Sequence, residues 1–268
     1  MKTMNKTIFK GIIMLLAAMV MTGCDSFLDI TPTGKVIAKT GKEYRALLTY
    51  EYKNFPEDRG LATLRGDEIT LDKTTTKAED YDSYFDIWAW NDLSQQSTTV
   101  SFGWRRYYHA IYIANYIIEN KDKITEATAD EINQLVGEAY MMRAYCHFLL
   151  VNLFAEPYTH CNAATTRGVP LSLKADVNAV LSCSSVEQVY QQVVDDVAKA
   201  KKHLTVEQWE EGYTYRFNTV SADALMARVC LYKGDWQNAL AAAQAVIEKH
   251  GELEDLTVSK VMPNYYKS

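Results

Sequence analysis

Four long segments of the chain repeat apolar residues with the period of an α-helix, and this pattern limits the fold more than any other feature. The expected helices cover residues 101–120, 128–154, 184–204 and 219–250, the last interrupted at Gly234. Few segments alternate apolar and polar residues with the period of two that a half-buried strand shows. We therefore predict an all-α fold in the main, with few short strands.

Capping boxes mark where two of these helices begin, at Thr128–Glu131 (TADE) and at Ser184–Glu187 (SSVE). The helical period then predicts which residues face inward. In the first three helices these are Trp104, Tyr107, Tyr108, Ile111, Ala114, Ile118, Leu135, Ala139, Met142, Cys146, Leu149, Leu153, Val189, Val193, Val197 and Leu204. Within the helices, His109 and His147 are expected to be interior histidines.

The segment from residue 54 to residue 100 shows no sustained helical period. It follows a shorter expected helix over Lys42–Tyr52 and mixes glycines, threonines and aspartates with aromatic residues. We predict a long ordered loop region here. Loops of this length in a compact domain are commonly functional.

The last helical segment contains a turn that resembles the turn of a tetratricopeptide repeat. Gly234-Asp235-Trp236 is followed by Ala239, so a glycine, an aromatic residue and a small residue fall at the offsets of that motif. An ordinary helical hairpin is the alternative. Because one such repeat is not stable alone, we expect repeats over about residues 101–251, stacked into a right-handed superhelix. On the final helix Trp236, Ala239, Leu240, Ala243 and Ile247 share one face.

The N-terminus predicts export and lipidation. Three lysines precede Gly11–Met21, an uncharged apolar run too short to span a bilayer as a mature helix but typical of a signal peptide. Met21-Thr22-Gly23-Cys24 resembles a bacterial lipobox, which places a signal peptide over residues 1–23 and acyl chains on Cys24 of the mature chain, residues 24–268. A simple secretory signal with an incidental cysteine is the alternative.

Charge and cysteine spacing exclude some partners. The chain carries 28 basic and 34 acidic residues, a net charge of −6, which argues against nucleic acid as the main partner. Cys146 and Cys230 lie in helical patterns and should be core residues, whereas Cys161 and Cys183 lie in loop-like sequence and could pair in an oxidising compartment. No cysteine or histidine spacing indicates a metal site, and no nucleophile motif or phosphate loop indicates an enzyme.

Several stretches, taken together and in this order, resemble the SusD/RagB family of nutrient-binding outer-membrane lipoproteins of Bacteroidota. These stretches are Cys24–Asp29, Gly66–Glu68, Asp86–Asn91, Gly137–Tyr145 with the following Leu153-Phe154, Gly168–Leu171 and Ala222–Ile247. Each piece is weak alone, but the combination covers nearly the whole mature chain. Family members are usually much longer, so the chain is expected to correspond to their N-terminal portion, with the C-terminal half missing.

The resemblance implies a function in polysaccharide utilisation. Such proteins sit at the cell surface, capture oligosaccharides or other nutrients, and deliver them to a SusC-like TonB-dependent transporter. They break no bond and use no cofactor. Two alternatives stay open: a tetratricopeptide-like scaffold that binds only the transporter or another protein, and a truncated form that binds no ligand.

We place the candidate ligand site on the loop region. Trp88 and Trp90 would form an aromatic platform, because alternation puts both on the same side of an extended stretch, with Asn91 and Asp67 as hydrogen-bonding partners. The alternative is that both tryptophans are core anchors. An acidic run could bind Ca²⁺ but is more typical of a solvated loop; it comprises Glu79, Asp80, Asp82, Asp86 and Asp92. Glu138 and Arg143 are expected to organise packing.

Overall fold

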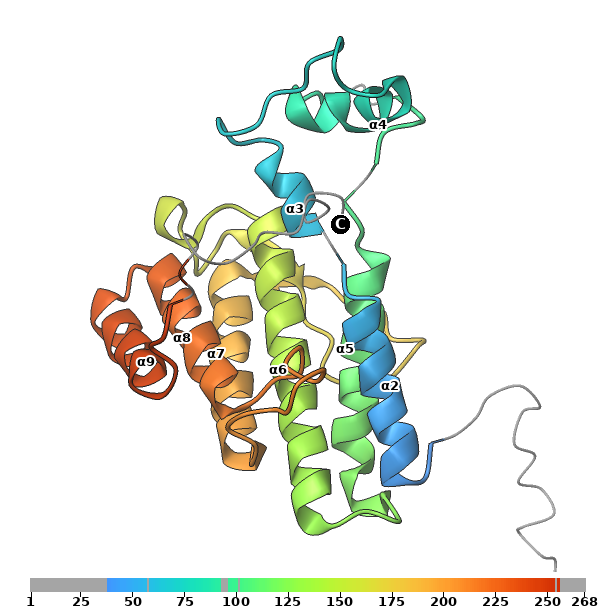
Figure 1. Cartoon of the computed structure of the whole chain (residues 1–268), viewed down its shortest axis with the longest axis vertical. Coiled ribbons are helices and arrows are strands. Elements are labelled where there is room, and N and C mark those ends of the chain that lie inside the picture. The colour runs from blue at the N-terminus through green and yellow to red at the C-terminus, as the bar shows by residue number, and fades with distance from the viewer. Residues whose placement is uncertain (1–37, 57, 93–95, 101, 254, 256–268) are drawn as a thin grey trace, which may run out of the picture. The chain divides into compact units, whose positions relative to one another are not determined.

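The mainly helical fold with few short strands is confirmed by the structure, a computed structural model that describes residues 38–56, 58–92, 96–100, 102–253 and 255 (Figure 1). Its helices are α2 (Gly41–Lys53), α3 (Asp58–Thr63), α4 (Ala78–Trp88), α5 (Arg105–Asn120), α6 (Ala129–Phe154), α7 (Val186–His203), α8 (Thr219–Lys233) and α9 (Trp236–Lys249), with the short 3₁₀ helices η2 (Lys121–Lys123) and η3 (Tyr158–His160). In the described part of the chain, β1 (Arg167–Pro170) and β2 (Cys183–Ser185) are the strands, and they pair antiparallel. The expected signal peptide and Cys24 lie outside the described residues.

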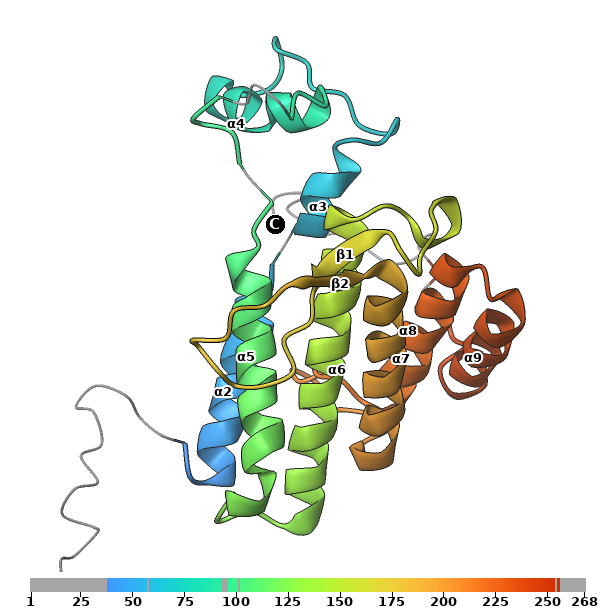
Figure 2. The same cartoon turned by 180° about the vertical axis from the view of Figure 1, so that it is seen from behind.

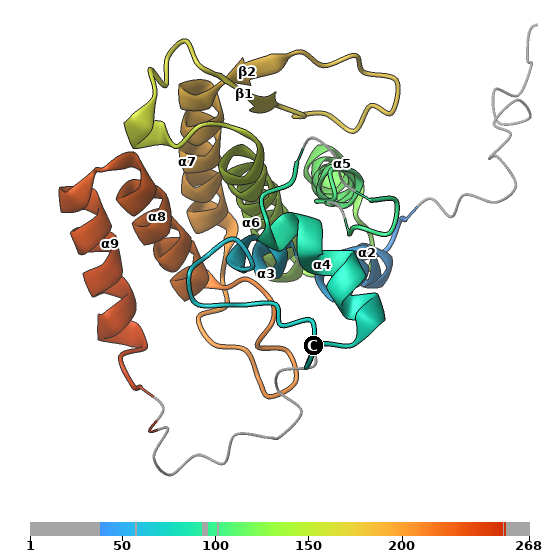
Figure 3. The ribbon, with the colours of Figure 1, turned by 90° about the horizontal axis from the view of Figure 1, so that it is seen from above.

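Helix α6 is the centre of the fold. Helices α2 and α5 pack on one side of it, and α7, α8 and α9 follow one another on the other side (Figure 3). The β1–β2 hairpin lies across α6 and α7, with β1 in contact with both helices (Figure 2). Residues on every side of α6 are buried, including Val136, Met141 and Leu150 beyond the stripe that the period predicted. A helix that is apolar around its circumference belongs inside a fold.

Three of the helix starts show how side chains satisfy free backbone amides. At α6 the Thr128 hydroxyl accepts from the Glu131 amide, and the Glu131 carboxylate accepts from the Thr128 amide, as predicted. Helix α2 starts with the same arrangement at Thr40. The predicted start of α7 is wrong by one residue, because strand β2 continues to Ser185 and the Ser185 hydroxyl caps the Gln188 amide.

The expectation of a long loop over residues 54–100 is wrong in part, since this segment contains α3 and α4. Helix α4 escaped the periodicity analysis because its apolar residues are mostly aromatic and pack on one another rather than on a broad core. The ring centroids of Tyr81 and Phe85 are 5.1 Å apart, and those of Phe85 and Trp88 are 5.9 Å apart. Ile87 is the fully buried apolar residue of this helix.

A buried ion pair joins three helices. Arg143 of α6 donates from Nε and Nη2 to the two carboxylate oxygens of Asp196 on α7, at 2.7 and 2.6 Å. Its Nη1 donates to Oδ1 of Asn115 on α5 at 2.7 Å. The amide of Asn115 in turn donates to the carbonyls of Ser172 and Lys174, in the loop between the strands. The expected packing role of Arg143 is therefore confirmed.

Glu138 of α6 joins this helix to α2 through a second set of buried polar contacts. Its Oε2 accepts from Nη1 of Arg45 and from the hydroxyl of Tyr52, both at 2.8 Å, and its Oε1 accepts from the amide of Gln134 at 3.0 Å. The Glu138 side chain is fully buried. Its negative charge is compensated by one guanidinium and two hydrogen-bond donors, which a buried carboxylate requires.

The hairpin of α8 and α9 has the predicted turn, but most side chains on the predicted face of α9 are exposed. Gly234 adopts φ of 75°, which favours glycine, and the Asp235 carboxylate caps the Asn238 amide. Ala239 is buried against α8, but Trp236, Leu240 and Ile247 are 67%, 61% and 64% exposed. The shared face that the sequence predicts on this helix is therefore mostly exposed in the part of the chain that the structure describes.

Of the remaining expectations, some are confirmed and others are wrong. Cys146 and Cys230 are buried as predicted, and the described cysteines, Cys161 and Cys183 among them, are all free thiols. His147 is buried as predicted, but His109 is exposed and its Nδ1 lies 3.0 Å from the Glu51 carboxylate. Trp104 is also exposed. Among the described helices, α6 included, we find none with the length and apolar character needed to cross a bilayer.

Replacing Gly137 with alanine should destabilise the fold. A Cβ at this position would lie 2.8 Å from both the backbone nitrogen and the Cγ of Leu204, so α6 and the end of α7 would have to separate. We expect the free energy of unfolding to fall by about 1–3 kcal/mol, although alanine favours a helix by about 1 kcal/mol. Urea denaturation measures this change. Gly60→Ala is the control, because a Cβ there meets nothing within 4 Å; equal stabilities of the two variants would contradict the prediction.

The buried His147 should make the fold sensitive to acid. Burial, with a smaller effect from Arg143, lowers the pKa of His147 from 6.5 to about 3. Its neutral ring accepts from the Ser172 amide at Nε2 and donates to the Arg143 carbonyl at Nδ1. As the pH falls below 6.5, the unfolded chain binds a proton that the folded chain excludes.

We therefore expect the free energy of unfolding to fall by about 2 kcal/mol between pH 7.5 and pH 5 because of this residue. Urea titrations across this range should show a shallower dependence in His147→Gln. The control is His250→Gln, which replaces an exposed histidine and is titrated over the same range. An unchanged slope in His147→Gln would refute the role of this histidine.

Candidate functional site

The predicted platform residues lie at the end of helix α4 rather than on an extended strand. Trp88 is the last residue of the helix, and the amides of Ala89 and Trp90 donate back to the carbonyls of Phe85 and Ile87. Trp90 then adopts φ of 56°, in the left-handed region that few residues other than glycine occupy. The expectation that both tryptophans lie on an extended stretch is therefore wrong, because Trp88 ends a helix and Trp90 lies in the turn that follows it.

Trp90 is an exposed ring held by a cation. It is 62% exposed, and the guanidinium carbon of Arg65 lies 4.7 Å from its ring centroid. Arg65 also lies 5.3 Å from the ring of Phe102 and forms an ion pair with Asp92. An exposed indole fixed in this way offers an apolar face to the C–H groups of a ligand.

Trp88 is held by contacts within the protein. It is half-buried, packs on Phe85, and its indole nitrogen donates to the carbonyl of Ile69 at 3.1 Å. This bond joins the end of α4 to the segment that precedes the helix. Of the two tryptophans, Trp90 is therefore the more exposed.

Asp86 organises the loop that carries Asn91. Its buried carboxylate accepts from the Thr99 hydroxyl at 2.6 Å, the Gln96 amide at 2.7 Å and the Asn91 side-chain amide at 3.0 Å. These hydrogen bonds hold the pKa of Asp86 below its usual value, and the bond from Thr99 has the largest effect. The sequence placed Asp86 in a solvated acidic run, because partners up to 13 residues away leave no local signal.

Asp67 is exposed in the segment that follows α3. Within the described residues no hydrogen bond or ion pair joins it to Trp88, Trp90 or Asn91. The structure instead brings Arg65, two residues earlier, onto Trp90. Sequence reasoning missed this arginine.

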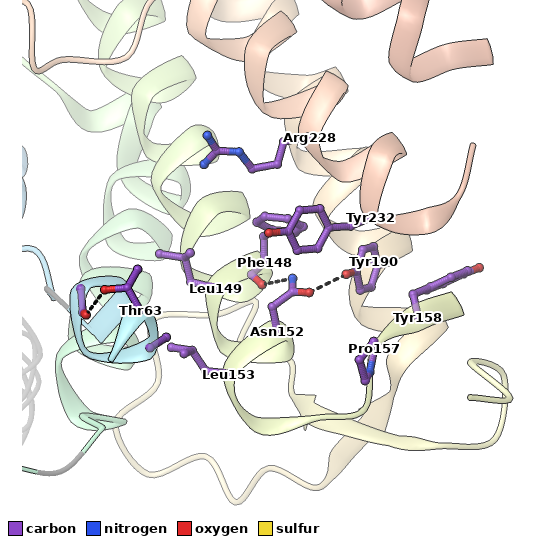
Figure 4. A pocket seen from close by; sticks show the side chains of 12 residues that line it. Thr63, Phe148, Leu149, Asn152, Leu153, Pro157, Tyr158, Tyr190, Arg228 and Tyr232 are labelled. Atoms are coloured by element: carbon purple, nitrogen blue, oxygen red, sulfur yellow. Dashed lines mark hydrogen bonds between the residues drawn. The ribbon is translucent and has the colours of Figure 1, made fainter. Parts of the chain in front are cut away.

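A second feature, which the sequence analysis did not find, is a cavity of about 610 Å³ (Figure 4). Its walls come from α3, α6, η3, α7 and α8, so no local motif could indicate it. The lining residues are Gly60, Ala62, Thr63, Phe148, Leu149, Asn152, Leu153, Pro157, Tyr158, Tyr190, Arg228 and Tyr232.

One wall of this cavity is a continuous aromatic cluster. The ring of Phe148 lies 5.2 Å from that of Tyr232 and 5.9 Å from that of Tyr190, and the rings of Tyr190 and Tyr158 are 4.9 Å apart. The Tyr190 hydroxyl donates to Oδ1 of Asn152 at 2.9 Å. Burial raises the pKa of Tyr190 to about 12, so this hydroxyl stays protonated near neutral pH.

Comparison with known proteins defines the family. The model of the SusD-like family described as "Starch-binding associating with outer membrane" matches residues 27–231. The chain belongs to this SusD-like family.

Relatives agree with this assignment. SusD-like protein P38 of Formosa agariphila is 26% identical over 250 residues, which cover 90% of this chain and 46% of that protein. A SusD superfamily structure from Bacteroides thetaiotaomicron matches with a TM-score of 0.63 and 25% identity, covering 81% of this chain and 48% of that one. A structure named as a laminarin binding SusD-like protein has a TM-score of 0.63 at 21% identity, covering 81% and 45% of the two chains.

The chain thus spans about half the length of the relatives it matches. The family is associated with the outer membrane, and its members bind carbohydrate and are not catalysts. Family membership therefore confirms the expectation of a protein that is not an enzyme.

Proposed function

We propose that this chain is a surface lipoprotein that binds oligosaccharides and delivers them to a SusC-like TonB-dependent transporter. The observation that carries the proposal is the exposed ring of Trp90, fixed by Arg65 in a chain of a carbohydrate-binding family. A neighbour of the same fold is named for laminarin binding, which supports a glycan as the ligand class.

The binding surface follows from the chemistry of sugars. A pyranose ring has an apolar C–H face that packs on an indole, and hydroxyl groups at its edge that require hydrogen-bonding partners. Trp90 supplies the apolar face, and we assign Asn91, the next residue, and Asp67, in the exposed segment after α3, as the polar groups that bind the sugar hydroxyls. Trp88 and Asp86 hold the end of α4 in place through their bonds to Ile69 and to the following loop.

The anchor follows from the sequence. Acyl chains on Cys24 would hold the protein at the outer membrane and near its transporter without adding contact area, because each buried CH₂ contributes about 0.8 kcal/mol. The acidic net charge of −6 favours a ligand and partner other than nucleic acid.

A second candidate function is a scaffold that binds only protein. It is favoured by the exposed apolar side chains of the last hairpin, Leu231, Trp236, Leu240 and Ile247. Exposed apolar patches of this kind mark interaction surfaces. The two candidates differ in whether the chain binds a polysaccharide by itself.

Trp90→Ala should weaken glycan binding. We expect the affinity to fall about tenfold, because stacking on an aromatic ring contributes about 1–1.5 kcal/mol. Affinity electrophoresis in gels that contain starch or laminarin measures the retention of each variant.

Trp236→Ala is the matched control, since Trp236 on α9 is 67% exposed and Trp90 is 62% exposed. Equal retention of Trp90→Ala and the unchanged chain would remove Trp90 from the site. A chain that neither polysaccharide retains, but that binds the transporter, would favour the scaffold.

Cys24→Ala should abolish lipidation. Cells grown with radiolabelled palmitate should label the unchanged chain and leave the Cys24→Ala chain unlabelled, because acylation needs the thiol and amino group of that cysteine. Cys161→Ala removes a different free thiol and should keep the label. Label that persists in Cys24→Ala would reject the anchor.

A further inference from the structure

We propose that the cavity between α3, α6, α7 and α8 is a second carbohydrate subsite, selective for a sugar residue that carries a carboxylate. The proposal rests on the proposed function, since it assumes a glycan ligand, but it concerns a different surface from that of Trp90. The ligand class is an acidic sugar, such as a uronate.

The size and walls of the cavity fit a sugar ring. Its volume of about 610 Å³ lies within the range of small-molecule sites, about 300–1,000 Å³. In Figure 4 the aromatic side chains line one side, and Thr63, Leu149 and Leu153 line the other. The half-exposed Tyr232 ring is anchored edge-on to the buried Phe148, at 68° between the ring planes. Tyr232 therefore offers a fixed ring on which a pyranose can stack.

The charge of the cavity selects the kind of sugar. Arg228 is the one charged residue among the described lining residues. It is exposed, and within the described part of the chain no carboxylate pairs with it. A planar guanidinium binds a carboxylate through two parallel hydrogen bonds, which a neutral sugar cannot match.

A second cation lies near Tyr158, although it does not itself line the cavity. The Nζ of Lys233, on the same helix as Arg228, is 5.5 Å from the centroid of the Tyr158 ring. The Glu187 carboxylate also lies close enough to Tyr158 to raise the pKa of its hydroxyl, so of the charged groups around the cavity only Arg228 lines it among the described residues. A positive cavity in a chain with a net charge of −6 favours a negatively charged ligand over a neutral one.

Paired ligands test this proposal. Calorimetric titration of the purified full chain compares trigalacturonate with its fully methyl-esterified form, which has the same ring skeleton without the charges. We expect trigalacturonate to bind about tenfold more tightly, and Arg228→Gln to reduce this ratio to about one. Arg105→Gln, at the exposed start of α5 and outside the cavity, should leave the ratio unchanged.

A second variant tests the stacking surface. Tyr232→Leu should weaken the binding of both ligands and keep their ratio, since it removes the ring but not the guanidinium. Each titration is repeated in the Trp90→Ala chain, so that binding at the α4 loop cannot conceal binding in the cavity.

The outcomes separate this proposal from the proposed function. A ratio that stays at tenfold in Arg228→Gln, equal affinities in the unchanged chain, or binding of neither ligand would each overturn the acidic-sugar subsite. If Trp90→Ala loses retention by starch or laminarin and Arg228→Gln leaves the affinity ratio unchanged, the proposed function is supported and the cavity subsite is rejected. If Arg228→Gln lowers the affinity ratio and Trp90→Ala leaves glycan retention unchanged, the cavity subsite is supported and the site at the α4 loop is rejected.

Discussion

The buried contact between Arg143 and Asp196 is the constraint on which the arrangement of helices depends. Burying two charges is costly unless the geometry is good and the remaining polar atoms are satisfied. Here both carboxylate oxygens accept from the guanidinium, and its third nitrogen donates to Asn115. Sliding α6 or α7 along its neighbours would leave a buried charge unpaired, and sliding α5 would remove the hydrogen bond between the guanidinium and Asn115. Glu138 extends the same logic to α2 through Arg45 and Tyr52.

This frame explains where ligand surfaces can form. The interior of the α5–α6–α7 group is filled with buried side chains, and the charges of Arg143 and Asp196 within it are paired. Two of the places where packing is incomplete are the turn after α4, where Trp90 is exposed, and the cavity at the C-terminal end of α6. Both surfaces are rich in aromatic residues and each has an arginine, Arg65 or Arg228. Rigid helices hold these side chains, and local hydrogen bonds such as those of Asp86 order the loop.

The sequence predictions are correct where the structure depends on residues close in the chain, and they fail where contacts that leave no local pattern decide it. The start of α6 and the turn at Gly234 were predicted correctly, because a cap or a left-handed residue depends on neighbours three or four positions away. The start of α7 was missed by one residue, because the pairing of β2 with a distant strand decides where that helix begins. Helix α4 was missed because its aromatic residues stabilise one another without the broad apolar stripe that periodicity detects.

The sequence by itself determined the fold class, the order of the long helices and the family resemblance, because these depend on local periodicity and on short motifs. Only the tertiary structure decided which residues are exposed, which cation lies on Trp90, and that a cavity exists at all. Arg65 and Trp90 are 25 positions apart, and the cavity draws residues from Gly60 to Tyr232. Proximity of that kind arises when helices pack, and no pattern along the chain records it.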